Sequence, residues 1–380
     1  MKIFIDCCNY FGDNTNLGDL AVYQVAERRL RAFAPQAVVQ FATFDPDQIE
    51  RSCPSFTPFV KINRELASDP GLLATIRQSD AVFAIGGGCM SDHFASHAIH
   101  ILDVLNEAAR LGKPTALFSC GFEPVTNPSL IASMRHVLPK LGWISCREGT
   151  HGPTLLRSLH IPETRFGITG DDALESAHMA SAFELGDSLG LGLRIAPYAG
   201  LDGRTLDCLR AGIGTAAQQL NVGLRPIPIS LDGPSDLAAF RSIFADSATG
   251  YDHFNQDSLP LEIRRCRVVV AGAYHAAVLA LAQGIPYVGI AGSDHYRGKL
   301  QGLNGLLPEG GVVLDPDSPY FQTELTRHVL RLWKAAPVLR SQLLRSVGRL
   351  VERSRDGFKC ALNFAEGSVH RPEIARGMVR

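Results

Sequence analysis

The chain shows its clearest hydrophobic pattern between residues 263 and 299, where two short apolar runs flank a longer apolar stretch. The runs at 268–271 and 287–291 lack alternating polar positions, as do parallel strands that helices cover on both faces. The stretch from about His275 to Gln283 is long enough for a helix, and the glycine and proline at 284–286 end it. The pattern predicts one βαβ unit.

Polar residues follow both predicted strands of this unit. In open parallel sheets, ligands bind outside the carboxyl ends of the strands. The residues that fall at this edge are Gly272, Tyr274, His275, Ser293, Asp294 and Lys299. We therefore expect the active site there, with Tyr274 either stacked on a sugar or buried in the core.

The alternation of apolar runs and helical stretches continues along the chain. Further strands are predicted near residues 2–6, 37–44, 80–88, 113–121, 143–146, 166–170, 189–198, 224–229 and 310–314. Residues 46–59 contain prolines and are expected to form a loop, and a long amphipathic segment begins at residue 321. A small, polar-rich stretch at about 177–190 is the expected connection between domains.

These features predict an α/β fold with two Rossmann-like domains facing a cleft and a C-terminal helical segment, which is a GT-B-like architecture. The domains are expected at residues 1–180 and 190–335, and the helical segment at 336–380. A chain of 380 residues exceeds the usual size of one hydrophobic core, which also favours two domains.

The composition bears on partners and compartment. Charged residues make up 20% of the chain and nearly cancel, to a formal charge of -1, so no electrostatic argument favours nucleic acid or an anionic membrane surface. No apolar run approaches the ~20 residues that span a bilayer. Nine scattered cysteines favour a reducing compartment, and the acidic first strand is unlike a secretory signal. We expect a cytoplasmic protein with small-molecule or carbohydrate partners.

Two polar or glycine-rich segments follow strands of the first half. The segment at 16–19 stands where a helix begins, which fits N-capping together with close approach of a ligand. The three glycines at 86–88 would let backbone N–H groups approach a phosphate or a sugar, although tight packing also explains them. The residues expected to contact a substrate are Asn16, Gly18, Asp19, Gly87, Gly88 and Asp92.

Charged residues follow two more strands. Arg147 and Glu148 are candidate substrate contacts, with Arg147 as a fork for phosphate or carboxylate; the alternative is an ion pair that fixes the loop. Asp171 and Asp172 come after the next strand, and successive side chains of an extended segment point in opposite directions. Asp172 is therefore expected to contact a hydroxyl or cap a helix, not to share a metal ion with Asp171.

Three histidines near the glycine segment also raise the question of a metal. His93, His97 and His100 have roughly helical spacing, but no carboxylate accompanies them at a set spacing. They are expected to form polar surface, and no metal site is predicted.

In their order along the chain, these motifs resemble the polysaccharide pyruvyl transferase family. The resemblance runs from residue 12 to about 300. It rests on Asn16-Leu17-Gly18-Asp19, Asp80, the glycines at 86–88 with Asp92, Arg147-Glu148, Gly170-Asp171-Asp172-Ala173, His275 with the following ALAQGIPYVGI, Tyr296 and Lys299.

The resemblance implies a transferase that moves the enolpyruvyl unit of phosphoenolpyruvate onto hydroxyls of a sugar or glycan precursor. By the same resemblance, Arg147 would bind the donor's phosphate or carboxylate, and His275 would be the general acid or base. Phosphoenolpyruvate would be a co-substrate, with no separate cofactor. A lipid-linked acceptor would bring the protein into peripheral contact with a membrane.

One position departs from the family's pattern. Members commonly carry an arginine two residues before this histidine, whereas this chain has Ala273 there. The second cation for the donor would then come from Lys299, Arg297 or Arg194.

Two alternatives to pyruvyl transfer therefore stay open. The first is a GT-B-type transferase with a nucleotide-sugar or other donor, whose mark would be an acidic contact to ribose such as Glu262 or Asp294. The second is a non-catalytic carbohydrate-binding protein.

Overall fold

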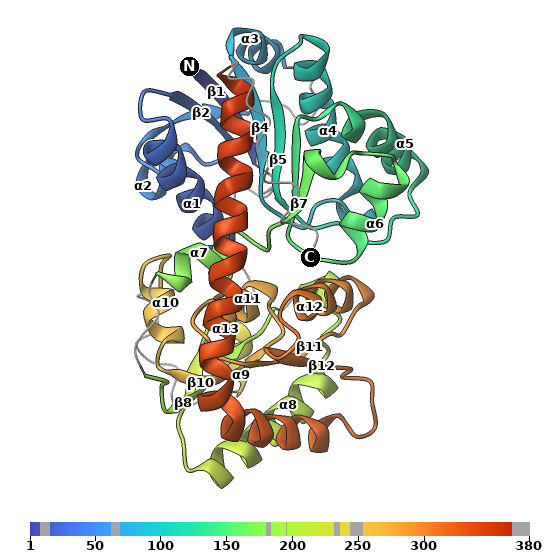
Figure 1. Cartoon of the computed structure of the whole chain (residues 1–380). Helices are drawn as coiled ribbons and strands as arrows, with labels where there is room; N and C mark the ends of the chain where they lie inside the picture. Colours follow the sequence, from blue (N-terminus) through green and yellow to red (C-terminus); the bar gives the residue numbers. More distant parts are fainter. Residues whose placement is uncertain are drawn as a thin grey trace. The chain divides into compact units, whose positions relative to one another are not determined.

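The computed structural model describes residues 1–7, 16–61, 69–179, 184–194, 196–231, 236–243 and 254–366. The chain forms two compact units. Unit 1 consists of Met1–Asp13, Val22–Asp172 and Leu350–Arg380, and unit 2 consists of Asn14–Ala21 and Ala173–Arg349. Each unit is described below by itself (Figure 1).

Unit 1 is built on a seven-stranded sheet in the order β3-β2-β1-β4-β5-β6-β7. All the paired strands are parallel. Its strands are β1 (Lys2–Cys7), β2 (Val38–Thr43), β3 (Phe56–Val60), β4 (Ala81–Ile85), β5 (Thr115–Cys120), β6 (Trp143–Cys146) and β7 (Phe166–Ile168). The direction in which strands are added reverses between β1 and β4.

The helices that lie wholly in unit 1 follow from capping residues as well as from apolar patterns. They are α2 (Pro46–Ser52), α3 (Pro70–Gln78), α4 (Ala95–Arg110), α5 (Pro128–Val137) and α6 (His151–Ser158). Asp45, Asp69 and Asn127 each accept hydrogen bonds from the first turn of the helix that follows, and each precedes a proline at the first helical position.

The prediction of a loop at 46–59 is wrong, because this segment forms α2 and β3. Pro46 occupies the first position of α2, where a proline lacks only a donor that the helix does not use. Pro58 lies in β3, the edge strand of the sheet, where proline is tolerated. Both prolines are therefore compatible with regular structure.

Unit 2 has a five-stranded sheet in the order β12-β11-β10-β8-β9, and all the paired strands are parallel. The strands are β8 (Ser188–Gly192), β9 (Leu224–Pro226), β10 (Cys266–Ala271), β11 (Tyr287–Ile290) and β12 (Gly311–Leu314). The helices that lie wholly in unit 2 are α7 (Ala173–His178), α8 (Gly203–Leu220), α9 (Asp236–Ile243), α10 (Ser258–Ile263), α11 (Tyr274–Ala282) and α12 (Asp294–Leu306).

The predicted βαβ unit is confirmed as β10-α11-β11. All nine residues of α11 are buried, which explains why its sequence is apolar on every side. The order of the sheet reverses between β8 and β10, since β9 is added on one side and β11 and β12 on the other. This reversal makes a topological switch point, where open parallel sheets bind ligands.

Two helices contribute residues to both units. Helix α1 (Leu17–Phe33) begins in unit 2 and continues in unit 1, and α13 (Phe321–Ala365), the long red helix of Figure 1, begins in unit 2 and ends in unit 1. Leu325 and Val329 of α13 lie in the core of unit 2. In unit 1, the ring of Phe358 stacks on Phe118, with centroids 4.6 Å apart.

The division between the units differs from the predicted domain boundaries. It falls between Asp172 and Ala173, before the polar-rich stretch, of which residues 180–183 lie outside the described part. Residues from Leu350 onward belong to unit 1 and do not make a separate segment. Within the described residues, no helix combines the length and apolar character needed to cross a bilayer.

Candidate functional site

In unit 2, the turn after β10 is fastened to the end of β8. The carbonyl oxygen of Gly192 accepts hydrogen bonds from the backbone N–H groups of Gly272, at 2.7 Å, and Ala273, at 3.0 Å. Helix α11 begins one residue later, so His275 lies in its first turn, at the carboxyl edge of the sheet. Its side chain is almost buried, since the residue is only 7% exposed.

The imidazole of His275 lies against Gly18. A methyl group at Gly18 would lie 2.1 Å from both Cγ and Nδ1 of His275, which is far inside van der Waals contact. Glycine is therefore the residue that lets α1 approach this ring. The sequence predicted that a ligand approaches Gly18, which stays a prediction; in the structure a side chain of the same unit lies against it.

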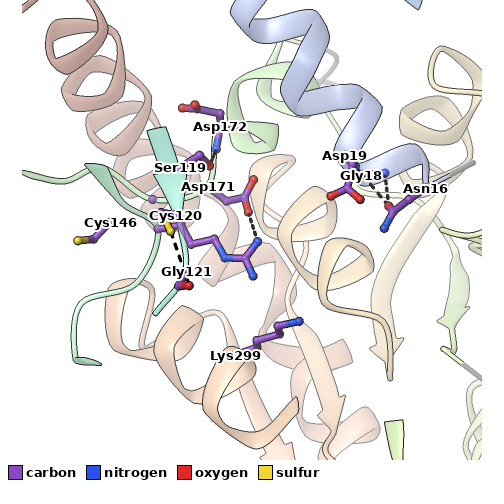
Figure 2. A network of polar contacts seen from close by, with 12 residues as sticks. Asn16, Gly18, Asp19, Ser119, Cys120, Gly121, Cys146, Asp171, Asp172 and Lys299 are labelled. Carbon is purple, nitrogen blue, oxygen red and sulfur yellow. Dashed lines mark hydrogen bonds and ion pairs between the residues drawn. The ribbon is translucent and has the colours of Figure 1, made fainter. Parts of the chain in front are cut away.

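The start of α1 is held in place by two sets of hydrogen bonds. Asn16 Oδ1 accepts from the backbone N–H groups of Gly18, at 3.0 Å, and Asp19, at 3.3 Å, which confirms the predicted N-cap (Figure 2). The backbone N–H of Leu17 donates to Ile229 O, at 2.8 Å, just beyond β9. The residue after Gly18, Asp19, is half-buried.

The other predicted residues of unit 2 lie on α11 and α12. Tyr274 is buried, and its ring makes an edge contact with His275, with centroids 5.3 Å apart; its predicted contact with a sugar stays a prediction. Lys299 Nζ lies 2.7 Å from His295 Nε2 and 5.4 Å from the centroid of the Tyr296 ring. Ser293 caps α12 by accepting a hydrogen bond from Tyr296 N.

In unit 1, Arg147 lies at the end of β6 and is only 3% exposed. Its Nη1 is 3.2 Å from Asp171 Oδ2, and its backbone N–H donates to Cys120 O, at 2.9 Å. A methyl group at Gly121 would lie 2.5 Å from Arg147 Nε. The guanidinium group therefore lies over Gly121, between the ends of β5 and β7.

An irregularity in β5 shapes this region. Ser119 has a left-handed backbone, with φ of 52°, and the register between β5 and β6 shifts beside it. Its N–H donates to Ser145 Oγ, at 2.8 Å, and its Oγ accepts from Asp172 N, at 2.9 Å. A non-glycine residue in this conformation is strained and needs such support. Nothing in the sequence around Ser119 indicated this conformation.

The two remaining acidic candidates of this region make contacts within the fold. Glu148 accepts hydrogen bonds from the backbone N–H groups of Thr150, His151 and Gly152, at 2.6–2.8 Å, and so caps α6. Asp172 accepts from Arg29 Nη1, at 2.9 Å, and from Ser354 Oγ. Burial raises the pKa of Asp172, although the Arg29 charge opposes that shift.

The sequence correctly suggested that the adjacent carboxylates face different ways, since Asp171 pairs with Arg147 and Asp172 with Arg29. It selected Asp172 as the substrate contact, whereas Asp171 is the carboxylate that touches the candidate arginine. Periodicity fixes that two neighbours diverge on an extended segment, but it does not fix which of them faces a given partner.

The glycine segment after β4 is tied to the end of β5. Gly86 and Gly87 have φ of 76° and 96°, which favours glycine at both positions. Gly86 N donates to Phe118 O, at 2.9 Å, and Gly87 O accepts from Gly121 N, at 3.0 Å. Gly87 and Gly88 are half-buried. The segment thus adjoins the glycine that lies under Arg147.

Asp92 holds a neighbouring loop. Its carboxylate accepts hydrogen bonds from the hydroxyl and backbone N–H of Thr126 and from the backbone N–H of Asn127, at 2.6–3.0 Å. The Thr126 hydroxyl and these backbone groups lower the pKa of Asp92. Asp92 is itself exposed.

Two of the three histidines, both on α4, differ from the predicted polar surface. His93 is exposed, but His97 and His100 are buried. His100 Nε2 lies 3.7 Å from Asp6 Oδ2, and Lys61 Nζ forms an ion pair with Asp6. Among the described residues, no group of three or more His, Cys, Asp or Glu side chains is arranged to hold a metal ion.

The fold defines the class of protein to which this chain belongs, the proteins of GT-B-like architecture. Two parallel-sheet α/β units give a GT-B-like architecture, and the solved structures that match it agree. UDP-GlcNAc 2-epimerase of Neisseria meningitidis, bound to UDP-GlcNAc, has a TM-score of 0.59 at 9% identity, over 95% of this chain and 99% of that chain. UDP-GlcNAc 2-epimerase of Methanocaldococcus jannaschii has 0.56 at 12%, over 87% and 92%. UGT2 of Phytolacca americana has 0.54 at 11%, over 96% and 98%.

The chain belongs to the polysaccharide pyruvyl transferase family, whose model matches residues 16–294. This match includes the start of α1, Arg147, His275 and the first residue of α12. No curated protein matches the chain in sequence. The predicted family and the predicted fold class are thus confirmed.

Proposed function

We propose that the protein transfers a pyruvyl group from phosphoenolpyruvate to hydroxyls of a sugar or glycan precursor. The family supports a transferase. The observation that supports the proposal best is the position of His275. Its imidazole is almost buried and lies against Gly18, where the strand order of the sheet of unit 2 reverses. A histidine at such a place has the chemistry for proton transfer near neutral pH.

In the proposed reaction, His275 delivers a proton to the methylene carbon of the donor, which makes C2 electrophilic. An acceptor hydroxyl oxygen then bonds to C2 and gives up its proton. When the oxygen of a second hydroxyl bonds to C2, the bond from C2 to the phosphate oxygen breaks; inorganic phosphate leaves with the proton of this hydroxyl, and the product is a cyclic ketal. Histidine suits both the donation and the removal of a proton.

Arg147 is proposed to bind the donor's phosphate or carboxylate. Its guanidinium is almost fully desolvated and is oriented by Asp171, and a desolvated fork of N–H donors binds such groups strongly. No separate cofactor is proposed. We also propose that the protein works in the cytoplasm and that an acceptor carried on a lipid would bring it to a membrane surface.

The role of His275 is tested with His275→Ala. Turnover should fall by about 10²-fold or more while phosphoenolpyruvate binding, measured by calorimetry, stays close to that of the wild type. His178→Ala is the matched control, because this half-buried histidine of the same unit contacts the carbonyl oxygen of Ala282, at the opposite end of α11 from His275. Unchanged turnover of His275→Ala would remove the residue from the mechanism.

The role of Arg147 is tested by titrating Arg147→Ala with phosphoenolpyruvate. Binding should weaken by about 10-fold or more, as expected for lost charge-assisted hydrogen bonds. Arg165→Ala is a suitable control, since Arg165 is a half-buried arginine of unit 1 that donates to Pro139 O. Equal affinities of Arg147→Ala and wild type would exclude Arg147 as a donor ligand.

A nucleotide-sugar donor is the second candidate, suggested by the UDP-bound neighbours of the same fold. Of its two predicted marks, Glu262 is engaged by Arg225, at 2.6 Å, and Arg265, at 3.2 Å, and it precedes β10, at the amino end of that strand. Asp294 is exposed and lies 3.6 Å from Arg297. Glu262 is therefore not placed to contact a ribose, whereas Asp294, in the first turn of α12, is the residue that would contact it in this second candidate.

A further inference from the structure

The switch point of unit 2 carries Arg194, one of the three cations that the sequence offered in place of the missing arginine. Arg194 follows the end of β8 by two residues, and the carbonyl of Gly192 is bound by the first two residues after β10. The chain at Arg194 therefore leaves the sheet beside the turn that leads into α11 and His275. The positive end of the α11 dipole lies at the same edge.

The guanidinium of Arg194 is held by Tyr198 and Asp236, but these contacts do not use all of its N–H donors. Nε and Nη2 donate to the hydroxyl oxygen of Tyr198, at 3.3 and 3.2 Å. Nη1 lies 3.6 Å from Asp236 Oδ1, which is an ion pair but too long for a hydrogen bond. Of its five N–H donors, two are thus used by hydrogen bonds to the described residues. The side chain is 16% exposed.

Asp236 is fixed independently of the arginine. Its side chain is fully buried, and Oδ2 accepts hydrogen bonds from the backbone N–H groups of Ile229, at 2.9 Å, and Ser230, at 2.8 Å. An ion pair that served only to neutralise this carboxylate would be expected to close to ~2.7–2.9 Å. The longer separation indicates that Asp236 orients Arg194 without consuming its donors.

A second cation stands close to the same cluster. The rings of Tyr198 and Tyr296 are parallel within 5°, with centroids 6.3 Å apart, and Lys299 Nζ lies over Tyr296. Arg194 after β8 and Lys299 on α12 are therefore joined through two tyrosines. Two fixed cations from different strand ends suit a ligand that carries two anionic groups.

We infer that Arg194 is an anion-binding residue of the donor site, with Asp236 and Tyr198 as its positioning residues. The inference rests on the proposed function for the identity of the donor. It names the residue of unit 2 that receives the donor's phosphate or carboxylate, beside the α11 N-terminus. Its geometry rests only on contacts within unit 2.

The test is calorimetric titration of the full-length protein with phosphoenolpyruvate, UDP and inorganic phosphate, for wild type, Arg194→Met and Arg194→Lys. Phosphoenolpyruvate should bind the wild type, and Arg194→Met should weaken binding by about 10- to 100-fold. Arg194→Lys should restore part of the loss, because lysine keeps the charge but not the fork. Arg267→Met is the matched control: this half-buried arginine lies near the amino end of β10 and donates to Trp333 O.

The outcomes separate this inference from the proposed donor. If the wild type binds UDP instead of phosphoenolpyruvate and Arg194→Met loses that binding, the donor is wrong and the role of Arg194 stands. If Arg194→Met or Arg194→Lys binds the wild type's ligand with unchanged affinity, the inference is overturned. If the wild type binds none of the three probes, both the inference and the donor fall. Thermal unfolding of each variant identifies a variant that does not fold, in which case Arg194→Lys alone decides.

Discussion

Gly18→Ala should displace the imidazole of His275. The added methyl would lie 2.1 Å from Cγ and Nδ1 of the ring. Carbon atoms pack at ~3.5 Å or more, so the ring or the start of α1 must move by about 1.4 Å. The ring is almost buried and α1 is held by its bonds to Asn16 and Ile229, so neither can yield without a loss of packing.

Two opposing terms set the expected change in stability. Overpacking of a buried contact costs about 1–3 kcal/mol. Glycine within a helix is worth about 0.5–1 kcal/mol less than alanine, and Gly18 has no left-handed backbone that would forbid a side chain. The free energy of unfolding should therefore fall by about 0–2.5 kcal/mol. Activity should fall further, by about 10²-fold, since a shift of ~1 Å in a reacting group has this effect.

A double-mutant cycle between positions 18 and 275 isolates the contact between Gly18 and the His275 ring. It measures stability and therefore needs no knowledge of the substrate. His275→Ala leaves Cβ, which would still lie 2.5 Å from the new methyl group, whereas His275→Gly leaves nothing there. The cost of Gly18→Ala, measured by urea denaturation, should thus decrease from wild type to His275→Ala and vanish in His275→Gly. Gly214→Ala is the control: Gly214 is exposed within α8, has no atom within 4 Å of the added methyl, and should gain about 0.5–1 kcal/mol.

The cycle has a clear refuting result. If Gly18→Ala costs as much in the His275→Gly background as in the wild type, the methyl is not opposed by the ring. The seat of His275 described here would then be wrong, and with it the reason for a glycine at this position.

Three further changes test other contacts. Gly121→Ala would place a methyl 2.5 Å from Arg147 Nε, so phosphoenolpyruvate affinity should fall by about 10-fold or more; calorimetry that shows wild-type affinity would contradict the position of the guanidinium. Arg29→Met would leave the buried Asp172 carboxylate without its cation, so the free energy of unfolding, measured with denaturant, should fall by about 3–5 kcal/mol. Adding Asp172→Asn should recover part of this stability, and no recovery would mean that the unpaired charge is not the cause. Burial raises the pKa of Asp236 from 3.8 to about 6, opposed by the bonds from Ser230 and Ile229 and by Arg194. The pKa of Asp236 is higher in the folded than in the unfolded protein, so the folded state binds this proton more tightly. Protonation of Asp236 therefore contributes its full stabilisation below about pH 4, and this contribution is lost as the pH rises through about 6. Relative to wild type, Asp236→Asn should therefore gain about 3 kcal/mol of stability between about pH 4 and pH 7, and parallel curves would exclude this titration.

The sequence predicted best where the chain pattern is local and apolar. The βαβ unit around α11 was found because its strands lack alternation and its helix has a glycine and proline at the end. The helix α2 and the edge strand β3 were missed because both contain prolines, which usually indicate loops. A proline fits at a helix start or in an edge strand, but the sequence does not show which strand lies at the edge. The position of a strand within its sheet is determined by the tertiary fold.

The sequence predicted where the candidate residues lie in the fold but not which groups they contact. The carboxyl edge, His275 and Arg147 follow from strand order, which the pattern supplies. The partner of Arg147 was not predictable, since a one-residue difference decides whether Asp171 or Asp172 faces it. Glu148 looked like a ligand contact because its capping partners are backbone groups, which every sequence offers.

The long helix α13 has a consequence for synthesis on the ribosome. The sheet of unit 1 is fully translated at Ile168, yet Phe358, which stacks on Phe118, and Ser354, which binds Asp172, follow the last residues of unit 2. At about 5–20 residues per second, the nascent unit 1 waits roughly 9–40 s for them. During that interval the Phe118 ring and the Asp172 carboxylate lack these partners, so of the two units the one whose sheet is translated earlier is completed later.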